Sequence, residues 1–383
     1  MAECEPVPYP FPRAELTAPA PAYRRLRRER PVCRVRLPSG DLAWLVSRCA
    51  DARLVLADPR FSKRALLDGG AARTRRGELL AGLLFTTDPP EHTELRARLT
   101  GALTPRRVAA LRPVVVGLAE RLLDDLEPGG DLMPAFVEPL AMSVICALLG
   151  VSVDEHRRYA RWAETVLSVD HFSDDEVSRA QRELLENIHA QVRAASGPGL
   201  IAALAADSPD SPDVLAVVKL VATLLVTGYE TMVAAIGCSV LTLLLHCGQI
   251  PAADPLLLEE LLRFVTFGDA LRSRRAVADV ELGGVLIRSG DVVMVSIASA
   301  NRDEDAFAEP ERFDPRRRGT RHLSFGHGPH FCVGAALARL ELEVALEVLA
   351  RRLPALRLAA PAEEIRLRHG SAEAPPESLP VTW

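Results

Sequence analysis

Apolar residues recur at every third or fourth position over long stretches of this 383-residue chain. The spacing covers residues 105–151 and 154–195, where Asp154 is placed to cap a helix, and it is typical of amphipathic helices. An almost wholly apolar run over 211–247 predicts a longer helix that is buried on most sides. Because helix follows helix along most of the chain, the pattern predicts a mainly α protein.

Alternating apolar and polar residues add a small β region. Residues 33–37 and 42–46 form two such runs around the turn-forming sequence at 38–41, so we expect a pair of short strands. A strand, hairpin and strand are predicted over 274–285, and a further strand over 292–297. These segments are too few and too short to change the class of the fold.

The length of the chain alone favours two domains, but its organisation does not. The sequence has no long Ser/Gly linker and no repeat of fixed period, so we expect residues 1–383 to form a single helix-rich domain. Its 48% hydrophobic and 25% charged residues are ordinary for a globular protein, and its net charge of −5 gives no indication of nucleic-acid binding.

Three observations bear on location. The apolar run contains Lys219 and Glu230, which would be costly in lipid, so we expect a core helix and no membrane span. The N-terminus lacks the apolar segment of a signal peptide. The cysteines are scattered and odd in number, which argues against a disulfide framework and for a reducing, cytoplasmic location. They are Cys4, Cys33, Cys49, Cys146, Cys238, Cys247 and Cys332.

The first candidate site is a glycine-rich loop that contains a single cysteine and leads into a predicted helix. It reads Phe325-Gly326-His327-Gly328-Pro329-His330-Phe331-Cys332-Val333-Gly334. Backbone N–H groups and the helix dipole would stabilise a thiolate there, so Cys332 is a candidate metal ligand or nucleophile. Two other interpretations are open: a buried structural cysteine, or a zinc site shared with His322, His327 and His330.

A second candidate follows residues 87–90. Thr87 or Asp88 can cap a helix there, with a proline in its first turn, and this places His92 and Arg96 on one helix face. Such a pair is more often a solvated basic face, but two cationic donors also suit a carboxylate ligand.

The third candidate lies in the middle of the long apolar run. Thr227 and Thr231 fall one helical turn apart on the same face, with Gly228 and Glu230 beside them. An alcohol and a carboxylate at such a position suit general acid chemistry. Alternatively, Thr231 donates to the carbonyl four residues earlier and Glu230 points into a polar pocket.

The cysteine loop, read as Phe-x-x-Gly-x-x-x-Cys-x-Gly, resembles the haem-binding signature of the cytochrome P450 superfamily of haem-thiolate proteins. The other motifs follow the order and spacing of that family along nearly the whole chain. The resemblance implies the cytochrome P450 fold, a triangular prism of helices around a buried haem. In that family the cysteine is the axial iron ligand, which favours O–O cleavage.

The resemblance also implies roles for individual residues. Cys332 would ligate the iron of haem b within the loop that begins with Phe325 and Gly326, and Glu230 and Thr231 would form the acid–alcohol pair that delivers protons to dioxygen. Cationic residues would bind the haem propionates, with Arg275 as a neighbouring rival of Arg274. They are His92, Arg96, Arg274 and His330. The Glu260–Arg263 pair would be structural, with Arg312 as its third partner.

The implied function is that of a bacterial, soluble haem-thiolate monooxygenase. It would use O2 to hydroxylate or epoxidise a small, largely apolar molecule, as a tailoring step in secondary metabolism. The sequence shows no flavin or iron–sulfur motif, so electrons would come from a ferredoxin and a ferredoxin reductase. Arg339, Arg351 and Arg352 are docking candidates or an ordinary solvated face. The resemblance implies a monomer; oxidative coupling or rearrangement without oxygen insertion, and non-catalytic haem binding, are the alternatives.

The chain departs from the family pattern in several places, among them Cys247 in place of a common proline and a longer C-terminal segment over residues 369–380. Thr227 replaces an alanine and Met232 a residue that is often threonine, and both could crowd the pocket or alter substrate fit. Phe267 replaces a proline that shapes the pocket wall. The segment before Glu259 is shorter than is usual.

Overall fold

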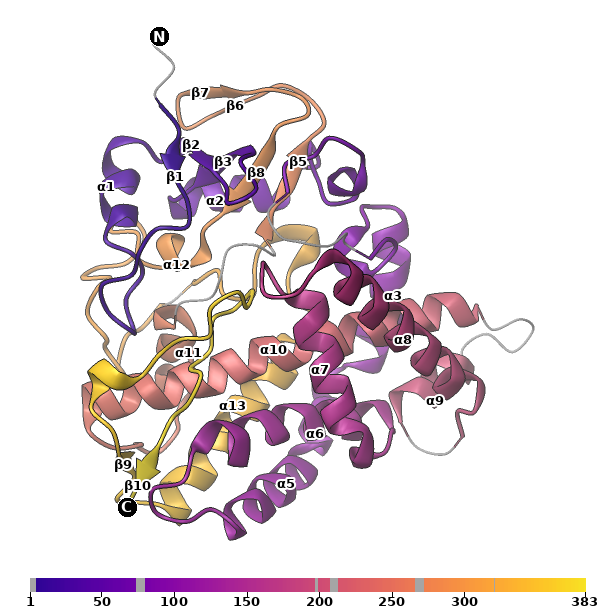
Figure 1. Ribbon diagram of the computed structural model, residues 1–383, viewed down its shortest axis with the longest axis vertical. Coiled ribbons are helices and arrows are strands. Elements are labelled where there is room, and N and C mark those ends of the chain that lie inside the picture. Colours follow the sequence, from indigo (N-terminus) through magenta and orange to yellow (C-terminus); the bar gives the residue numbers. More distant parts are fainter. Residues whose placement is uncertain (1–4, 74–79, 197–198, 207–212, 266–271, 320) are drawn as a thin grey trace.

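The computed structural model describes residues 5–73, 80–196, 199–206, 213–265, 272–319 and 321–383. Helices fill most of the molecule, and a twisted sheet lies at one end, at the top of Figure 1. The predicted fold class, mainly α with a small β region, is confirmed. The helices are α1 (Ala22–Glu29), α2 (Cys49–Ala57), α3 (Glu91–Ala102), α4 (Pro105–Ala110), α5 (Arg112–Asp124), α6 (Glu138–Leu149), α7 (His156–Leu167), α8 (Asp174–Arg193), α9 (Leu200–Ala206), α10 (Val214–Cys247), α11 (Pro255–Phe264), α12 (Ile297–Ala300) and α13 (Ala335–Arg352).

The main sheet has the strand order β1-β2-β3-β8-β5-β4. β2 and β3 form the predicted antiparallel pair, with Cys33 opposite Leu45, and β8 pairs in parallel with β3. β6 and β7 form a separate hairpin, and β9 pairs with β10 near the C-terminus. The strands are β1 (Val7–Pro8), β2 (Val32–Arg36), β3 (Leu42–Val46), β4 (Phe61–Ser62), β5 (Arg274–Ala276), β6 (Val280–Leu282), β7 (Val285–Ile287), β8 (Val292–Val295), β9 (Arg357–Leu358) and β10 (Val381–Thr382).

Helix α10 is the central element of the helical part and crosses the middle of Figure 1. It starts where Asp213 accepts a hydrogen bond from the Ala216 N–H at 3.1 Å, and it ends at Gly248 in the left-handed conformation. It is long and apolar enough to cross a membrane, but 78% of its most apolar 18-residue window is buried inside the protein. It packs against α6, α7 and α8, as the continuous apolar pattern predicts.

Gly228 lies where α10 contacts α6. A Cβ atom at this position would lie 2.8 Å from Cδ1 of Ile145 in α6, closer than packed carbon atoms approach. A larger residue would therefore require the Ile145 side chain to move aside.

Two predicted helix caps are wrong. α3 begins after Pro90 without a side-chain cap, because the Asp88 carboxylate instead accepts hydrogen bonds from Ser62 Oγ and from the Lys63 and Arg64 N–H groups, while the hydroxyl of Thr87 donates to the Leu84 carbonyl. α7 follows a 3-10 turn that contains Asp154, so Asp154 caps nothing.

The predicted third partner of Glu260 and Arg263 is also wrong. The Glu260 carboxylate accepts from Arg263 Nε at 2.7 Å and from Arg317 Nε at 3.0 Å, whereas the Arg312 side chain pairs with exposed Glu309. Arg312 contributes only its backbone carbonyl, because the loop directs its side chain outward. Glu260 and Arg263 are fully buried, so they are not a surface ion pair.

Candidate active site

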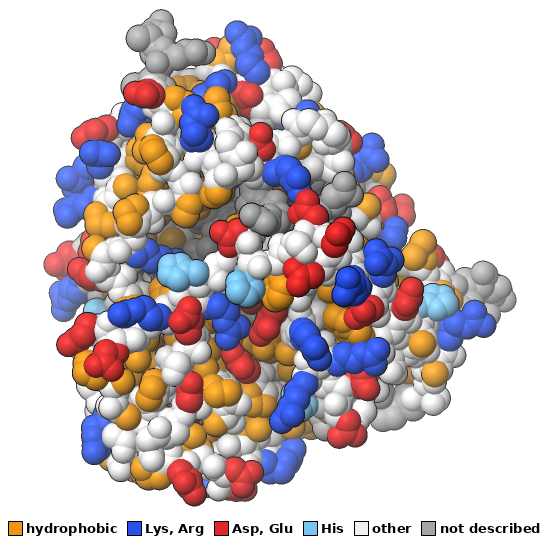
Figure 2. All heavy atoms as spheres, in the orientation of Figure 1, with side chains coloured by type: hydrophobic (Ala, Val, Ile, Leu, Met, Phe, Trp, Pro, Cys, Tyr) orange, Lys and Arg blue, Asp and Glu red, His pale blue; other side chains and the backbone are white. Residues whose placement is uncertain are grey.

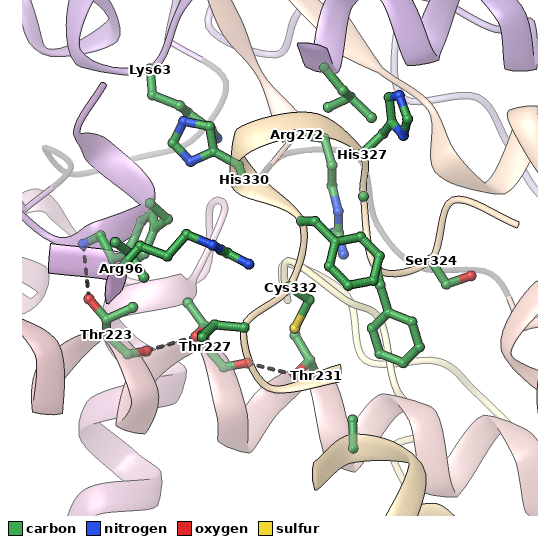
Figure 3. Close-up of a pocket in the computed structure, with 18 of the residues that line it drawn as sticks. Lys63, Arg96, Thr223, Thr227, Thr231, Arg272, Ser324, His327, His330 and Cys332 are labelled. Atoms are coloured by element: carbon green, nitrogen blue, oxygen red, sulfur yellow. Dashed lines mark hydrogen bonds between the residues drawn. The ribbon is translucent and has the colours of Figure 1, made fainter. Parts of the chain in front are cut away.

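A cavity of about 250 Å³ lies between the pocket face of α10, the cysteine loop and the start of β5 (Figure 3). Apolar side chains form part of its wall, including Leu84, Phe85, Met232 and Ala235. Phe325, Gly326, His330 and Cys332 of the loop also line it. The cavity thus brings the cysteine loop together with the long helix, although they are about a hundred residues apart in sequence.

The cysteine loop is held by its own backbone. The Cys332 N–H donates to the Phe325 carbonyl at 2.8 Å, and the Gly326 N–H donates to the Leu323 carbonyl at 2.7 Å. Gly328 has a positive φ of 71°, and a Cβ there would lie 2.7 Å from the Leu56 carbonyl oxygen at the end of α2. The sequence at 328 must therefore be glycine for the loop to pack on α2.

Cys332 precedes α13, as predicted, and its sulfur is directed into the pocket (Figure 3). Burial raises the pKa of its thiol, although the Gly334 N–H and the cations Arg96, Arg272 and Arg339 favour the thiolate. The Cys332 side chain is exposed to the cavity, so a metal ion bound there would pair with its thiolate.

The predicted cationic residues line the same cavity. His92 and Arg96 project from α3, Arg274 from β5, and His330 from the cysteine loop. The rings of His92 and His330 lie 4.1 Å apart between centroids, and the buried Nε2 of His92 has no hydrogen-bond partner among the described residues. Arg274 lines the cavity, whereas the guanidinium of its predicted rival Arg275 donates to the carbonyls of Gly290 and Ala65 outside the cavity.

Lys63 and Arg272, which sequence reasoning missed, add to this group. The only available signals were that Lys63 is one of two lysines in the chain and that Arg272 lies two residues before Arg274. Arg272 also donates to Glu373 at 2.6 Å.

The positive charges around the cavity favour the binding of an anion. Burial, with the neighbouring arginines, holds the pKa of Lys63 well below its usual value. Burial lowers the pKa of Arg274 to about 10, and burial together with the surrounding cations lowers that of His330 to about 2. Among the described residues that line the cavity there is no aspartate or glutamate. A ligand with negative charge would relieve this repulsion.

Helix α10 presents a row of hydroxyl groups to the cavity (Figure 3). Thr223, Thr227 and Thr231 each donate to the carbonyl four residues earlier, at 2.8, 2.7 and 2.6 Å. The alternative bond considered for Thr231 is therefore present, and it leaves the hydroxyl oxygen able to accept a hydrogen bond from the cavity. Thr223 was not predicted; its place four residues before Thr227 was the signal.

Glu230 lies on another face of α10 and is not among the residues that line the cavity. Its buried carboxyl accepts a hydrogen bond from Ser371 Oγ in the C-terminal loop, and its Oε2 has no partner among the described residues. Burial is the main reason that its pKa is raised to about 8. The structure thus places Thr231 at the cavity and Glu230 behind it.

Comparisons with known proteins agree with this geometry. The family model for cytochrome P450 matches residues 255–355. Nocardicin C N-oxygenase from Nocardia uniformis subsp. tsuyamanensis is 40% identical over 98% of each chain, and mycinamicin IV hydroxylase/epoxidase from Micromonospora griseorubida is 38% identical over 100% of each. The solved structure of the mixed-function P450 MycG, 37% identical, covers 99% of this chain and 100% of its own with a TM-score of 0.86. The chain belongs to the cytochrome P450 family.

Cytochrome P450 proteins bind haem through a cysteine thiolate, and the residues present fit that group. A pocket with apolar walls receives the sulfur of Cys332, and an unpartnered His92 Nε2 and a group of cations without lining carboxylates suit two propionates. Among the described residues, no group of three or more His, Cys, Asp or Glu could hold a metal ion, and His322 instead contacts Glu259 at 3.1 Å.

The basic residues suggested for partner docking are all paired in this cytochrome P450. Arg339 donates to Glu259 at 2.5 and 3.1 Å and lies over the Phe325 ring. Arg351 and Arg352 both contact Glu120.

Phe267, the predicted replacement of a proline in the pocket wall, lies outside the described residues.

Proposed function

We propose that this cytochrome P450 is a monooxygenase that hydroxylates or epoxidises a small, largely apolar molecule in secondary metabolism. The observation that carries the proposal is the shared cavity, in which the Cys332 sulfur and the Thr231 hydroxyl face apolar side chains. The printed names of its relatives support it, since one is an N-oxygenase of nocardicin C and another a hydroxylase/epoxidase of mycinamicin IV.

The proposed cofactor is haem b, with Cys332 as the axial ligand. When bound, it supplies the redox and dioxygen-activating chemistry that no side chain offers. The chain's contribution is to bind and orient it. Arg96, Arg274 and the two histidines His92 and His330 would hold the propionates through charge-assisted hydrogen bonds.

The proposed proton path uses Thr231 and Glu230. Thr231 lines the cavity, and its oxygen can accept a hydrogen bond while its hydrogen is given to the Thr227 carbonyl. The raised pKa of Glu230, about 8, favours the protonated carboxyl at neutral pH, so Glu230 can act as a proton donor.

The electron donor is proposed to be a ferredoxin with its reductase, because the sequence contains no flavin or iron–sulfur motif of its own. Relatives from Nocardia and Micromonospora are matched over their full length, which supports a bacterial enzyme of the same organisation. We further propose a cytoplasmic monomer.

The test is turnover with heavy-isotope dioxygen, on a substrate selected by its effect on the haem spin state. Monooxygenation predicts a product that gains one labelled oxygen atom, and a Thr231→Ala variant should consume electrons with little product. A product without the label would contradict the proposal and would favour oxidative coupling or rearrangement.

A further inference from the structure

The C-terminal loop, residues 366–378, contacts both Glu230, the proposed proton donor, and a residue that lines the cavity. Ser371 donates its hydroxyl hydrogen to Oε1 of Glu230 on α10. Two residues later, Glu373 accepts a hydrogen bond from Arg272, which lines the cavity. One short loop therefore contacts the proposed proton donor and the wall of the proposed active site.

The backbone of this loop fixes the orientation of the Ser371 hydroxyl. Its oxygen accepts hydrogen bonds from the Glu373 and Ala374 N–H groups, both at 3.2 Å. A hydroxyl has two acceptor sites and one hydrogen, so all three are used once Glu230 is counted. Ser371 is thus locked as a donor to Glu230.

This arrangement decides which oxygen of Glu230 carries the proton. Oε1 accepts from Ser371, so in the neutral acid the proton resides on Oε2. Oε2 is buried and has no partner among the described residues. It is therefore the oxygen free to give up a proton.

Several charged groups face Glu230 from the elements packed around it. Glu373 and Arg368 belong to the C-terminal loop and Glu164 to α7. Burial raises the pKa of Glu230 most, the Ser371 hydroxyl lowers it, the two carboxylates raise it, and Arg368 lowers it. Ser371 is thus the strongest of the interactions that favour the ionised form.

We propose that Ser371 is a positioning residue for proton delivery, which keeps Oε1 of Glu230 as an acceptor and stabilises the carboxylate left after Oε2 releases its proton. The Oε2–H bond breaks, the proton passes to a water or hydroxyl on the cavity side, and solvent water returns a proton before the next turnover. The inference rests on the proposed monooxygenase function, since it describes how that reaction is supplied with protons.

The test compares Ser371→Ala with Ser371→Thr. Alanine removes the donor that stabilises the carboxylate, so the pKa of Glu230 should rise. The yield of product per electron pair consumed should fall at high pH, and the pH of this fall should then rise by about one unit or more. Threonine keeps the hydroxyl and should retain the wild-type limit. Ser371→Cys, a weak donor of similar shape, serves if the alanine variant does not fold.

Two measurements are made on the haem-bound protein: product yield against pH, and the infrared C=O band of protonated carboxyl groups. The band of Glu230 is identified by its loss in Glu230→Gln, and its titration should shift in Ser371→Ala. Ser378→Ala, on the same loop, is the matched control and should leave both unchanged.

The outcomes separate the two proposals. If the wild type forms no oxygenated product at any pH, the monooxygenase function fails, and the infrared titration still reports on Ser371. If the wild type is active but Ser371→Ala keeps the wild-type pH limit and the wild-type infrared titration, the role of Ser371 is overturned.

Discussion

Two groups of buried or partly buried cations in this protein have different surroundings. The Glu260 cluster (Glu260, Arg263 and Arg317) has a carboxylate at its centre, whereas the pocket cations (Lys63, Arg96, Arg272 and Arg274) line a cavity without lining carboxylates among the described residues. Burying a charge is costly unless it is paired. The first group is therefore balanced within the protein, whereas the second faces a cavity in which an anionic ligand would bind, although Arg272 also donates to Glu373, which is not among the residues that line the cavity.

The hydrogen bonds of the Glu260 cluster support this view. The carboxylate of Glu260 accepts from Arg263 at 2.7 and 2.8 Å and from the Asp314 N–H at 2.9 Å. Arg263 also donates to the carbonyls of Asn301 and Pro310. The cluster joins α11 to the loop that precedes the cysteine, so its role is to hold the fold around the site.

The largest effect is expected from Glu260→Ala. The change leaves the buried Arg263 and the partly buried Arg317 without their carboxylate, and breaking such a network costs about 3–5 kcal/mol of unfolding free energy. Urea denaturation measures it. Glu309→Ala removes an exposed pair with Arg312 and should cost less than about 1 kcal/mol. Equal effects of the two changes would show that the Glu260 cluster contributes no more to stability than an exposed ion pair does.

Arg274→Ala is expected to have a smaller effect, and on haem affinity instead of on stability. Without a ligand the change removes a buried cation from a group of like charges, so the stability of the apoprotein should not fall. Haem affinity should fall about ten- to a hundredfold, since a hydrogen bond to a charged group is lost. Haem titration of the apoprotein and urea denaturation measure the two quantities.

Arg275→Ala provides the matched control, because this neighbouring arginine contacts backbone carbonyls outside the cavity. Its effect on haem affinity should be small. Apoprotein that is strongly destabilised by Arg274→Ala, with haem affinity unchanged, would show that Arg274 is structural.

The sequence predicted the parts of the site that depend on local pattern. The cysteine loop, the β2–β3 pair and the positions of Thr227 and Thr231 on α10 follow from short-range spacing and from the resemblance to a known family. The cap at Asp88 was wrong because its carboxylate is taken by residues 62–64, which precede it by more than twenty positions.

Partners that are distant in sequence could not be predicted. Glu260 pairs with Arg317 rather than Arg312, because the intervening loop turns the Arg312 side chain to solvent. Ser371 meets Glu230 across 141 positions, and Glu373 meets Arg272 across 101. Such contacts depend on the path of the C-terminal loop across the molecule, and the spacing of residues in the sequence does not predict that path.

The most direct test of the central claim is the carbon-monoxide difference spectrum of the reduced protein, for the wild type and for Cys332→Ser. If the pocket holds haem through the Cys332 thiolate, the wild type will show a strongly red-shifted Soret band that the variant lacks. The same red-shifted band in Cys332→Ser, or folded wild type that takes up no haem, would contradict the account.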